Sequence, residues 1–400
     1  MSAPHGLWPT CRLEDVATIE RDGVLSENIE AGTNYVGLEH IDSDGQFVGV
    51  RRVLPGELAS NKFRFGPKHI LFGKLRPYLR KTARPQFQGI CSTDIVPILT
   101  GPRIERDFLF HFLRHPRTVE QAVLRSAGAN LPRLSPRDLA SFEVPLPPLR
   151  EQRRIADILD KADTTRRKRK TAIDLTDDLL RSAFLEMVGP GAADYPTWSV
   201  RSVESLAAIR PDAMRTGPFG SDLLHSEFVD DGIAVLGIDN AVQNRFAWGE
   251  RRFVTPAKYE RLRRYTVFPG DVIVTIMGTT GRSAVVPDDI PTAITTKHLA
   301  TITLDRSQAE PEFVSQALFR HPDVLRQIAV ANRGAIMSGL NLGLIKGLRL
   351  PVPPITRQRE FSHVTARIRA LTGRLETARD TADGLFESLV ARLFTTSKGS

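Results

Sequence analysis

Cysteine is almost absent from this chain of 400 residues, which contains two, Cys11 and Cys91. Two cysteines are too few for a disulfide framework or for a zinc site with four cysteine ligands. Long apolar runs are also missing, since none approaches the roughly 18 residues that a membrane span needs. The opening stretch, MSAPHGLWPTCRLEDV, lacks the apolar core of a signal peptide. We therefore expect a cytoplasmic protein.

Motifs of catalysis are missing as well. The sequence has no Gly-Lys followed by Ser or Thr, no G-x-G-x-x-G and no G-x-S-x-G, which argues against a P-loop, a dinucleotide site and a hydrolase elbow. It also lacks Asn-Pro-Pro and Asp-Pro-Pro, used by amino-methyltransferases, and the (D/E)-x-K motif of nucleases. His111 and His115 have no nearby cluster of carboxylates or cysteines, so packing or surface positions are favoured over a metal site. We predict no catalytic residue, no metal site and no cofactor bound by this chain.

The charge of the chain is positive. Lys and Arg number 55 against 46 Asp and Glu, which gives a formal net charge of +9 and a sequence pI of about 9.8. A basic balance of this size indicates a polyanionic partner, usually a nucleic acid. The alternative is a soluble protein that is merely basic.

A segment near the middle of the chain is repeated near its end. PLPPLREQ begins at Pro145 and PVPPITRQ begins at Pro351, 206 residues later, and the same offset relates Gln152 to Gln358. Arg-His-Pro at 114–116 recurs at 320–322 with this offset. Because proline is tolerated in the first turn of a helix, the Pro-Pro pairs predict helix starts more than ligands of a proline-binding domain.

The repeat extends upstream with small changes of register. PKHILFGKLRPYLRK at Pro67 resembles PGDVIVTIMGTTGRS at Pro269, and YVGLEH at Tyr35 resembles VLGIDN at Val235. HILF, DIVPIL, DVIVTI and LATITL are predicted strands, whereas RDFLFHFLRHP and PEFVSQALFRHPDVLRQIA have helical spacing. We predict an α+β fold of two similar mixed domains in tandem, each followed by a long helix. The predicted parts are 1–145, 146–190, 191–350 and 351–400.

Both long helices carry a heptad pattern. In the second, apolar or small residues recur at alternating steps of three and four, a spacing typical of a coiled coil. They are Phe361, Val364, Ile368, Leu371, Leu375, Ala378, Ala382, Leu385 and Leu389. The corresponding positions of the first long helix, 206 residues earlier, form a weaker seam that includes Ile155, Ile158, Thr176 and Leu179. We expect the two helices to pair as an antiparallel coiled coil, since an unpaired stripe would promote aggregation.

This layout resembles the specificity subunit of Type I restriction–modification enzymes. The resemblance covers essentially the whole chain and is carried by the tandem arrangement, by PLPPLREQRRIADILDKAD and by TGPFGS at Thr216. It implies that each mixed domain is a target-recognition domain that reads one half of a split DNA site. The paired helices would then serve as a ruler and as the platform for two modification (methyltransferase) subunits, which restriction subunits join. S-adenosylmethionine, ATP and Mg would belong to those partners.

The resemblance also implies partner contacts at the helix starts. Glu151, Gln152 and Gln358 are the predicted contact residues. The second copy departs from the pattern, because Arg357 stands where the first copy has Glu151.

Candidate DNA contacts lie in loops rich in Lys, Arg, Gly and polar residues. Arginine can read guanine or hold a phosphate, and glycines let backbone amides approach phosphates. In the first domain the predicted contacts are Lys74, Arg76, Tyr78, Arg80, Lys81, Asn130 and Arg133. In the second they are Thr216, Phe219, Ser221, Arg251, Arg252, Thr279, Thr280, Arg282, Lys297 and Asn341.

One further basic run, RRKRK at 166–170, lies inside the first long helix. Its charges point to all faces of the helix, so a solvated face or a contact with an acidic partner is favoured over base readout. Two other functions stay open for the chain. One is a non-specific nucleic-acid-binding scaffold whose repeat pairs with itself, and the other is an enzyme whose motifs are unrecognised.

Overall fold

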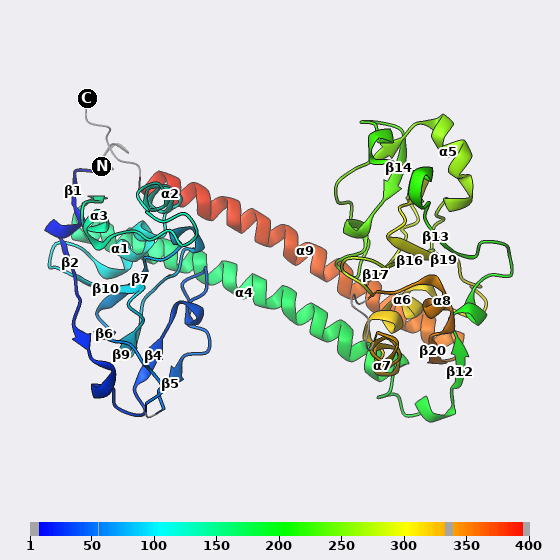
Figure 1. Cartoon of the computed structure of the whole chain (residues 1–400), viewed down its shortest axis with the longest axis horizontal. Coiled ribbons are helices and arrows are strands. Elements are labelled where there is room, and N and C mark those ends of the chain that lie inside the picture. Colours follow the sequence, from blue (N-terminus) through cyan, green and yellow to red (C-terminus); the bar gives the residue numbers. More distant parts are fainter. Residues whose placement is uncertain (1–7, 55, 333–338, 395–400) are drawn as a thin grey trace. The chain divides into compact units, whose positions relative to one another are not determined.

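The computed structural model describes residues 8–54, 56–332 and 339–394 (Figure 1). The chain forms two compact units, Met1–Lys170 with Thr377–Ser400, and Thr171–Glu376. Each unit contains one mixed domain and a part of both long helices, α4 (Leu149–Val188) and α9 (Ile355–Leu393). The division into four parts predicted from the sequence stays a prediction, and its outer ends, 1–7 and 395–400, lie outside the described residues.

The first unit contains two main sheets. An antiparallel sheet has the order β2 (Ala17–Ile19), β10 (Ile95–Thr100), β7 (His69–Gly73) and β8 (Thr82–Ala83). The other has the order β3 (Gly23–Val24), β6 (Lys62–Phe65), β9 (Gly89–Cys91), β4 (Asn34–Val36) and β5 (Arg51–Arg52), and in it β4 and β9 run parallel. Strands β1 (Thr10–Arg12) and β11 (Glu143–Pro145) pair with each other. The predicted strands HILF and DIVPIL are confirmed as β7 and β10.

The second unit repeats this topology. Its antiparallel sheet has the order β13 (Met214–Thr216), β19 (Leu299–Ile302), β16 (Val272–Thr275) and β17 (Ser283–Val285). The order β15 (Phe253–Val254), β14 (Ile233–Leu236) and β18 (Ala293–Thr295) again contains a parallel pair, β14 with β18. Strands β12 (Ser199–Ser202) and β20 (Arg349–Val352) pair as β1 and β11 do. The predicted strands DVIVTI and LATITL are confirmed as β16 and β19.

Two short helices in each unit flank the Arg-His-Pro repeat, α1 (Arg106–Leu113) and α2 (Pro116–Leu124) in the first and α6 (Pro311–Arg320) and α7 (Pro322–Ala331) in the second. The first unit also has α3 (Pro136–Ala140), and the second also has α5 (Pro256–Leu262) and α8 (Leu342–Gly347). Pro116 and Pro322 each open a helix, and the histidine before each caps it. The Nδ1 atom of His115 accepts a hydrogen bond from the backbone N–H of Arg117 at 3.1 Å, and His321 caps α7 in the same way at 3.2 Å.

Each long helix contributes to the cores of the mixed domains. In the first unit, Ile155 and Leu159 of α4 pack with Phe108 of α1 in one apolar cluster. In the second, the rings of Phe184 on α4 and Phe361 on α9 lie 5.8 Å apart in a core that also includes Phe313. The burial of these side chains joins each domain to its helices, since the apolar area removed from water stabilises the folded state.

Within each unit the two helices run antiparallel, as predicted. The predicted seam is confirmed in part, since its members Phe361, Ile368, Ile155 and Thr176 are buried. In the second unit, Thr365 is 1% exposed and Thr372 donates a hydrogen bond to Thr176 with 2.8 Å between their Oγ1 atoms. The predicted seam residue Leu371 is 38% exposed, and Leu179 is 51% exposed. The seam of the second unit thus contains threonines beside the apolar residues, and Leu371 and Leu179 point away from it.

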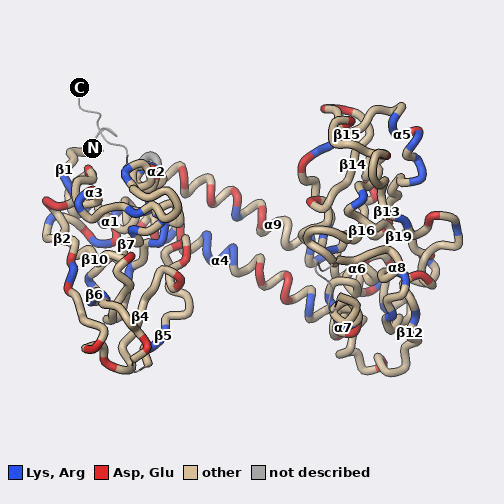
Figure 2. Tube along the Cα trace, in the orientation of Figure 1, with Lys and Arg blue, Asp and Glu red and all other residues tan. Residues whose placement is uncertain are grey.

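In the first unit the helix pair is held by charge. Arg166 on α4 pairs with Asp383 on α9, with 2.5 Å between Nε and Oδ1, and Nη1 of Arg169 donates to the carbonyl of Ala378 at 2.6 Å. Leu385, another predicted seam residue, is 60% exposed. Both helices carry acidic and basic residues along their length (Figure 2). None of the helices in the described ranges is long and apolar enough to cross a membrane.

Candidate nucleic-acid interface

Two predicted loops of the first domain are brought together by backbone hydrogen bonds. The turn after β7 contains the 3-10 helix Pro77–Leu79, and the N–H of Arg76 donates to the carbonyl of Pro132 at 2.8 Å. The N–H of Leu134 donates to the carbonyl of Lys74 at 2.9 Å. The predicted contacts at 74–81 and 130–133 therefore belong to one surface.

The backbone of this turn is strained. Arg76 and Arg80 have φ angles of 51° and 56°, in the left-handed region that non-glycine residues rarely adopt. Such outliers cost about 1–3 kcal/mol each and occur preferentially where a site needs them. The Nε atom of Arg76 is buried and has no hydrogen-bond partner among the described residues.

The side chains of this surface divide into two groups. Three cations are engaged inside the domain. Arg80 donates to the carbonyl of Arg114 at 3.1 Å, Lys81 donates to that of Leu38 at 2.6 Å, and Arg133 pairs with Asp94 at 3.1 Å. The others face outward to different degrees: Tyr78 is 49% exposed, Asn130 is exposed, and Lys74 and Arg76 are half-buried. The contacts of Arg80, Lys81 and Arg133 give them a role in holding the loops, and their contact with DNA stays a prediction.

The second domain has the equivalent turn with a different composition. Its left-handed positions are glycines, Gly278 with φ 70° and Gly281 with φ 79°. The N–H of Gly281 donates to the carbonyl of Thr275 at 2.9 Å and closes the turn. Arg282 stacks its guanidinium over the ring of Phe319 at 4.8 Å. The predicted contact Thr279 is exposed in this turn, and Thr280 is half-buried.

Three predicted stretches of the second domain meet around a cavity of about 650 Å³. Its lining includes Pro218 from the stretch 216–221, then Arg252 and Lys297. A side chain at Gly217 would lie 2.3 Å from the carbonyl oxygen of Thr295, so glycine is required for this close approach to β18. In the same stretch Thr216 is half-buried, Phe219 is 51% exposed and Ser221 is exposed.

Charged side chains of both signs lie at the cavity. Arg252 donates through Nη1 and Nη2 to Oδ1 of Asp239 at 3.2 and 3.1 Å. Burial lowers the pKa of His298, and the positive charges of Lys297 and Arg252 lower it further. The sequence did not single out Asp239 or His298, although Asp239 belongs to the repeated segment VLGIDN.

The two remaining predicted contacts of this domain have internal partners. Arg251 stacks its guanidinium on the ring of Trp248 at 4.6 Å. Asn341 caps α8, because its Oδ1 accepts from the N–H of Leu344 at 2.8 Å. Contact of either residue with DNA stays a prediction.

The repeated glutamines hold the domains to the long helices. Gln152 and Gln358 are both fully buried. The Oε1 atom of Gln152 accepts from the N–H of Glu105 at 2.7 Å, and that of Gln358 accepts from the N–H of Glu310 at 2.8 Å. Each Nε2 donates to two carbonyls, those of Arg103 and Pro147 in the first copy and those of Gln308 and Pro353 in the second. The geometry gives both glutamines this internal role and gives no support to their predicted contact with a partner.

The position before each glutamine differs between the copies. Glu151 forms an ion pair with Arg154 on the same helix, with 2.9 Å between Oε2 and Nε. Arg357, its counterpart in the second copy, pairs with Asp194 at 2.7 Å within the second unit. The partner contact of Glu151 stays a prediction.

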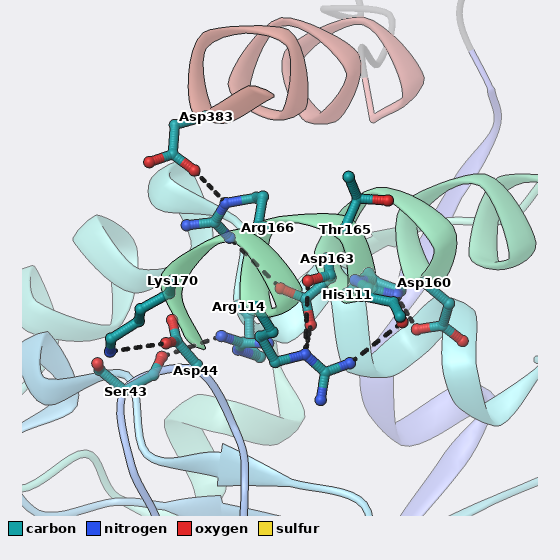
Figure 3. A network of polar contacts seen from close by, with 12 residues as sticks. Ser43, Asp44, His111, Arg114, Asp160, Asp163, Thr165, Arg166, Lys170 and Asp383 are labelled. Carbon is teal, nitrogen blue, oxygen red and sulfur yellow. Dashed lines mark hydrogen bonds and ion pairs between the residues drawn. The ribbon is translucent and has the colours of Figure 1, made fainter. Parts of the chain in front are cut away.

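Two residues of the basic run at 166–170, Arg166 and Lys170, are engaged within the first unit, as Figure 3 shows. Arg166 pairs with Asp383 as described above, and Lys170 lies 3.8 Å from Asp44. A neighbouring ion network joins α4 to the domain: Asp160 accepts from Arg84 at 2.7 Å and lies 2.8 Å from Nε2 of His111. The acidic residues that this run contacts thus belong to the chain itself, and His111 is buried in an ion network.

Comparisons with known proteins agree with this architecture. Residues 6–174 match the family model described as Type I restriction modification DNA specificity domain. The chain is 31% identical over 199 residues to the Type I restriction enzyme EcoDI specificity subunit of Escherichia coli, a match that covers 47% of this chain and 44% of that relative. It is 18% identical over 303 residues to the MjaVIII specificity subunit of Methanocaldococcus jannaschii, covering 73% of this chain and 69% of the relative.

Solved structures share the fold. The S subunit of a Type I restriction–modification system from M. genitalium has a TM-score of 0.62 at 13% identity, with 100% of this chain and 99% of that one covered. A chain from a study of complex assembly and conformational transition of the type I R-M system has a TM-score of 0.58 at 19% identity, with 98% of each chain covered.

Proposed function

We propose that the chain is a Type I restriction–modification specificity subunit and recognises the DNA sequence on which a larger enzyme complex acts. Its family match and its fold support this proposal. The observation that carries this proposal is the match of residues 6–174 to a DNA specificity domain, together with the repeat of the same topology in the second unit. The net charge of +9 supports a polyanionic partner.

Each domain reads one half of a divided DNA site. The equivalent turns each contain two left-handed residues but differ in chemistry, because these residues are Arg76 and Arg80 in the first and Gly278 and Gly281 in the second. Guanidinium groups can read guanine edges, whereas a glycine turn offers backbone amides to phosphates. Two different surfaces on the same repeated fold can recognise two different half-sites, whereas a symmetric dimer recognises two identical ones.

The chemistry of the complex belongs to its partners. We assign methyl transfer to two modification subunits docked on the paired helices, and DNA cleavage to restriction subunits that join them. S-adenosylmethionine, ATP and Mg belong to those subunits. The purified chain should therefore neither methylate nor cut DNA by itself, and methyl transfer by the chain alone would contradict the assignment.

Exchange of a domain tests the proposal. Residues 1–145 are replaced by the corresponding part of a relative, and the methylated motif of the host is determined by sequencing. One half of the motif should change and the other should persist. The reciprocal exchange of residues 191–350 is the matched control and should change the other half. A motif that changes in both halves after one exchange would contradict the assignment of one domain to one half-site, and a motif unaffected by deletion of the gene would remove the proposed function altogether.

A further inference from the structure

The cavity of the second domain lies at the ends of two parallel strands. Gly237 follows β14 directly and Thr296 follows β18, and both residues line the cavity. The N–H of Thr296 donates to the carbonyl of Leu236 at 2.9 Å, which holds the two strand ends together. A volume of about 650 Å³ lies within the range of small-ligand sites.

The inside of the cavity combines an apolar wall with unsatisfied oxygen atoms. Phe228 and Ile238 belong to the apolar part of its lining. Among the lining residues, Asp239 and Thr296 each have a buried oxygen, Oδ2 and Oγ1, that no hydrogen bond within the described residues satisfies. Buried polar atoms are nearly always paired in folded proteins, so these two favour a ligand that brings N–H donors.

The other polar groups of the lining favour a negative charge on the same ligand. Arg252, Lys297 and His298 all line the cavity, and Asp239 is the acidic residue among its lining. Arg252 pairs with Asp239 at 3.1 Å and with Glu250 at 3.3 Å, whereas Lys297 is an exposed cation. A ligand with a flat apolar ring, N–H donors on its edge and an anionic group matches all three properties of the cavity.

We propose that this cavity binds one nucleotide unit, with the base against the apolar wall, its amino group satisfying Asp239 and Thr296, and its phosphate beside Lys297 and His298. The unit has two sources, a free deoxynucleoside monophosphate or a nucleotide that leaves the stack of bound DNA. The DNA source rests on the proposed function, because the predicted contacts at 216–221, 251–252 and 297 surround the cavity. In that case the second domain reads one base outside the duplex.

The first arm of the test uses free nucleotides. The purified full chain is titrated with dAMP, dGMP, dCMP and TMP by calorimetry, beside Thr296→Val and Lys297→Met. Lys346→Met is the matched control, since Lys346 pairs with Glu204 on another surface of the unit. Saturable binding of one nucleotide per chain that weakens about ten-fold or more in the two cavity variants, but not in the control, supports the proposal with a free nucleotide as the source. Circular dichroism melting shows that each variant is folded.

The second arm uses DNA in the assembled complex with its modification partner. 2-Aminopurine replaces each base of the second half-site in turn, because its fluorescence rises when it leaves the stack. The proposal with DNA as the source is supported if the fluorescence rises at one position with the wild-type complex. This rise should be lost when the DNA is saturated with the Thr296→Val complex. The proposal is overturned if no free nucleotide binds and no position brightens, or if binding and fluorescence are unchanged in both cavity variants. A complex that still methylates its motif in that case would leave the proposed function standing.

Discussion

The hydroxyl of Thr372 donates to the hydroxyl of Thr176 across the helix pair of the second unit. Each hydroxyl also bonds a carbonyl of its own helix, that of Ile173 at 2.7 Å for Thr176 and that of Ile368 at 3.0 Å for Thr372, so a single substitution removes the hydrogen bond between the helices and leaves the other hydroxyl a partner. Thr176→Val and Thr372→Val should each lower the free energy of unfolding by about 1 kcal/mol, and the double variant should lose less than the sum of the two because both remove the same hydrogen bond. Urea denaturation measures this cycle. Thr381→Val, whose hydroxyl bonds its own helix at Thr377, is the control and should show no coupling with Thr176→Val.

The buried glutamines allow a larger test of stability. Gln152→Leu removes three hydrogen bonds and leaves the N–H of Glu105 and two carbonyls without partners. We expect the free energy of unfolding of the first unit to fall by about 3 kcal/mol, with an equal effect of Gln358→Leu on the second. Gln86→Leu, at an exposed position, should change it by less than about 0.5 kcal/mol. Equal effects of all three variants in guanidinium denaturation would show that the hydrogen bonds of the buried glutamines do not contribute to stability.

The capping histidine of the first unit makes stability depend on pH. Burial, with Arg117 and Arg80 nearby, lowers the pKa of His115 to about 4, and protonation would abolish the Nδ1 acceptor that caps α2. The pKa in the unfolded chain is about 6.5, so this contribution is complete above that pH and is lost as the pH falls toward 4. His115→Asn can still accept the capping hydrogen bond but cannot titrate. Between pH 6.5 and 4 the wild type should lose on the order of 2 kcal/mol more than this variant in thermal or chemical denaturation. Parallel stability curves would show that His115 does not titrate in this range.

A substitution at Arg76 in the strained turn can separate the effect of backbone strain on stability from the effect of the side chain on DNA binding. Arg76→Gly relieves a φ of 51°, so the domain should be as stable as the wild type or more stable by about 1 kcal/mol. DNA binding by the complete complex should nevertheless weaken by about 1–3 kcal/mol if the guanidinium reads a base. Uniform weakening across sequences with a smaller salt slope would assign Arg76 to a phosphate. The control Arg326→Ala, at an exposed ion pair with Asp323, should leave binding unchanged.

The length of the helices is open to a direct test. Four residues inserted into both α4 and α9 add about 6 Å, which corresponds to no more than about two base pairs. If the helices act as a ruler, the unspecified gap of the methylated motif should lengthen by one or two base pairs while both half-sites persist. The insertion also rotates the helix by about 40°, so some activity should be lost as the DNA twists to compensate. An unchanged gap would leave the helices with a docking role alone.

Much of the fold was predictable because each pattern occurs twice in the chain, so that one copy supports the interpretation of the other. Strands β7 and β16 and the starts of the long helices after the two Pro-Pro pairs were visible as paired patterns in the sequence. The helix seam was predictable only in part, because Phe361 and Ile368 are buried as predicted, whereas Leu371 is exposed and Thr365 is buried. Thr372 donates a hydrogen bond to Thr176 on the facing helix, and no hydropathy pattern records such pairing.

The candidate interface was predictable as loops, but not in the orientation of its side chains. Arg80 and Lys81 looked like free cations, yet backbone carbonyls from distant segments, those of Arg114 and Leu38, accept from them. The union of the 74–81 and 130–133 loops depends on a hydrogen bond between main-chain atoms, which sequence composition cannot reveal. Asp239 could have been found, since the repeat places it opposite Glu39.

The joint made by Gln152 and Gln358 has a consequence for how such chains diversify. In each copy the amide bonds main-chain groups of the adjoining domain and of the segment that enters the helix, so the hydrogen bonds of the joint make no demand on side-chain identity there. A mixed domain of different sequence can attach to the same long helix if its backbone follows the same course at these hydrogen bonds. Genetic recombination at the Pro-Pro segments would therefore exchange whole surfaces in one step while the hydrogen bonds of the joint survive. Selection can then act on new combinations of domains without first repairing their attachment.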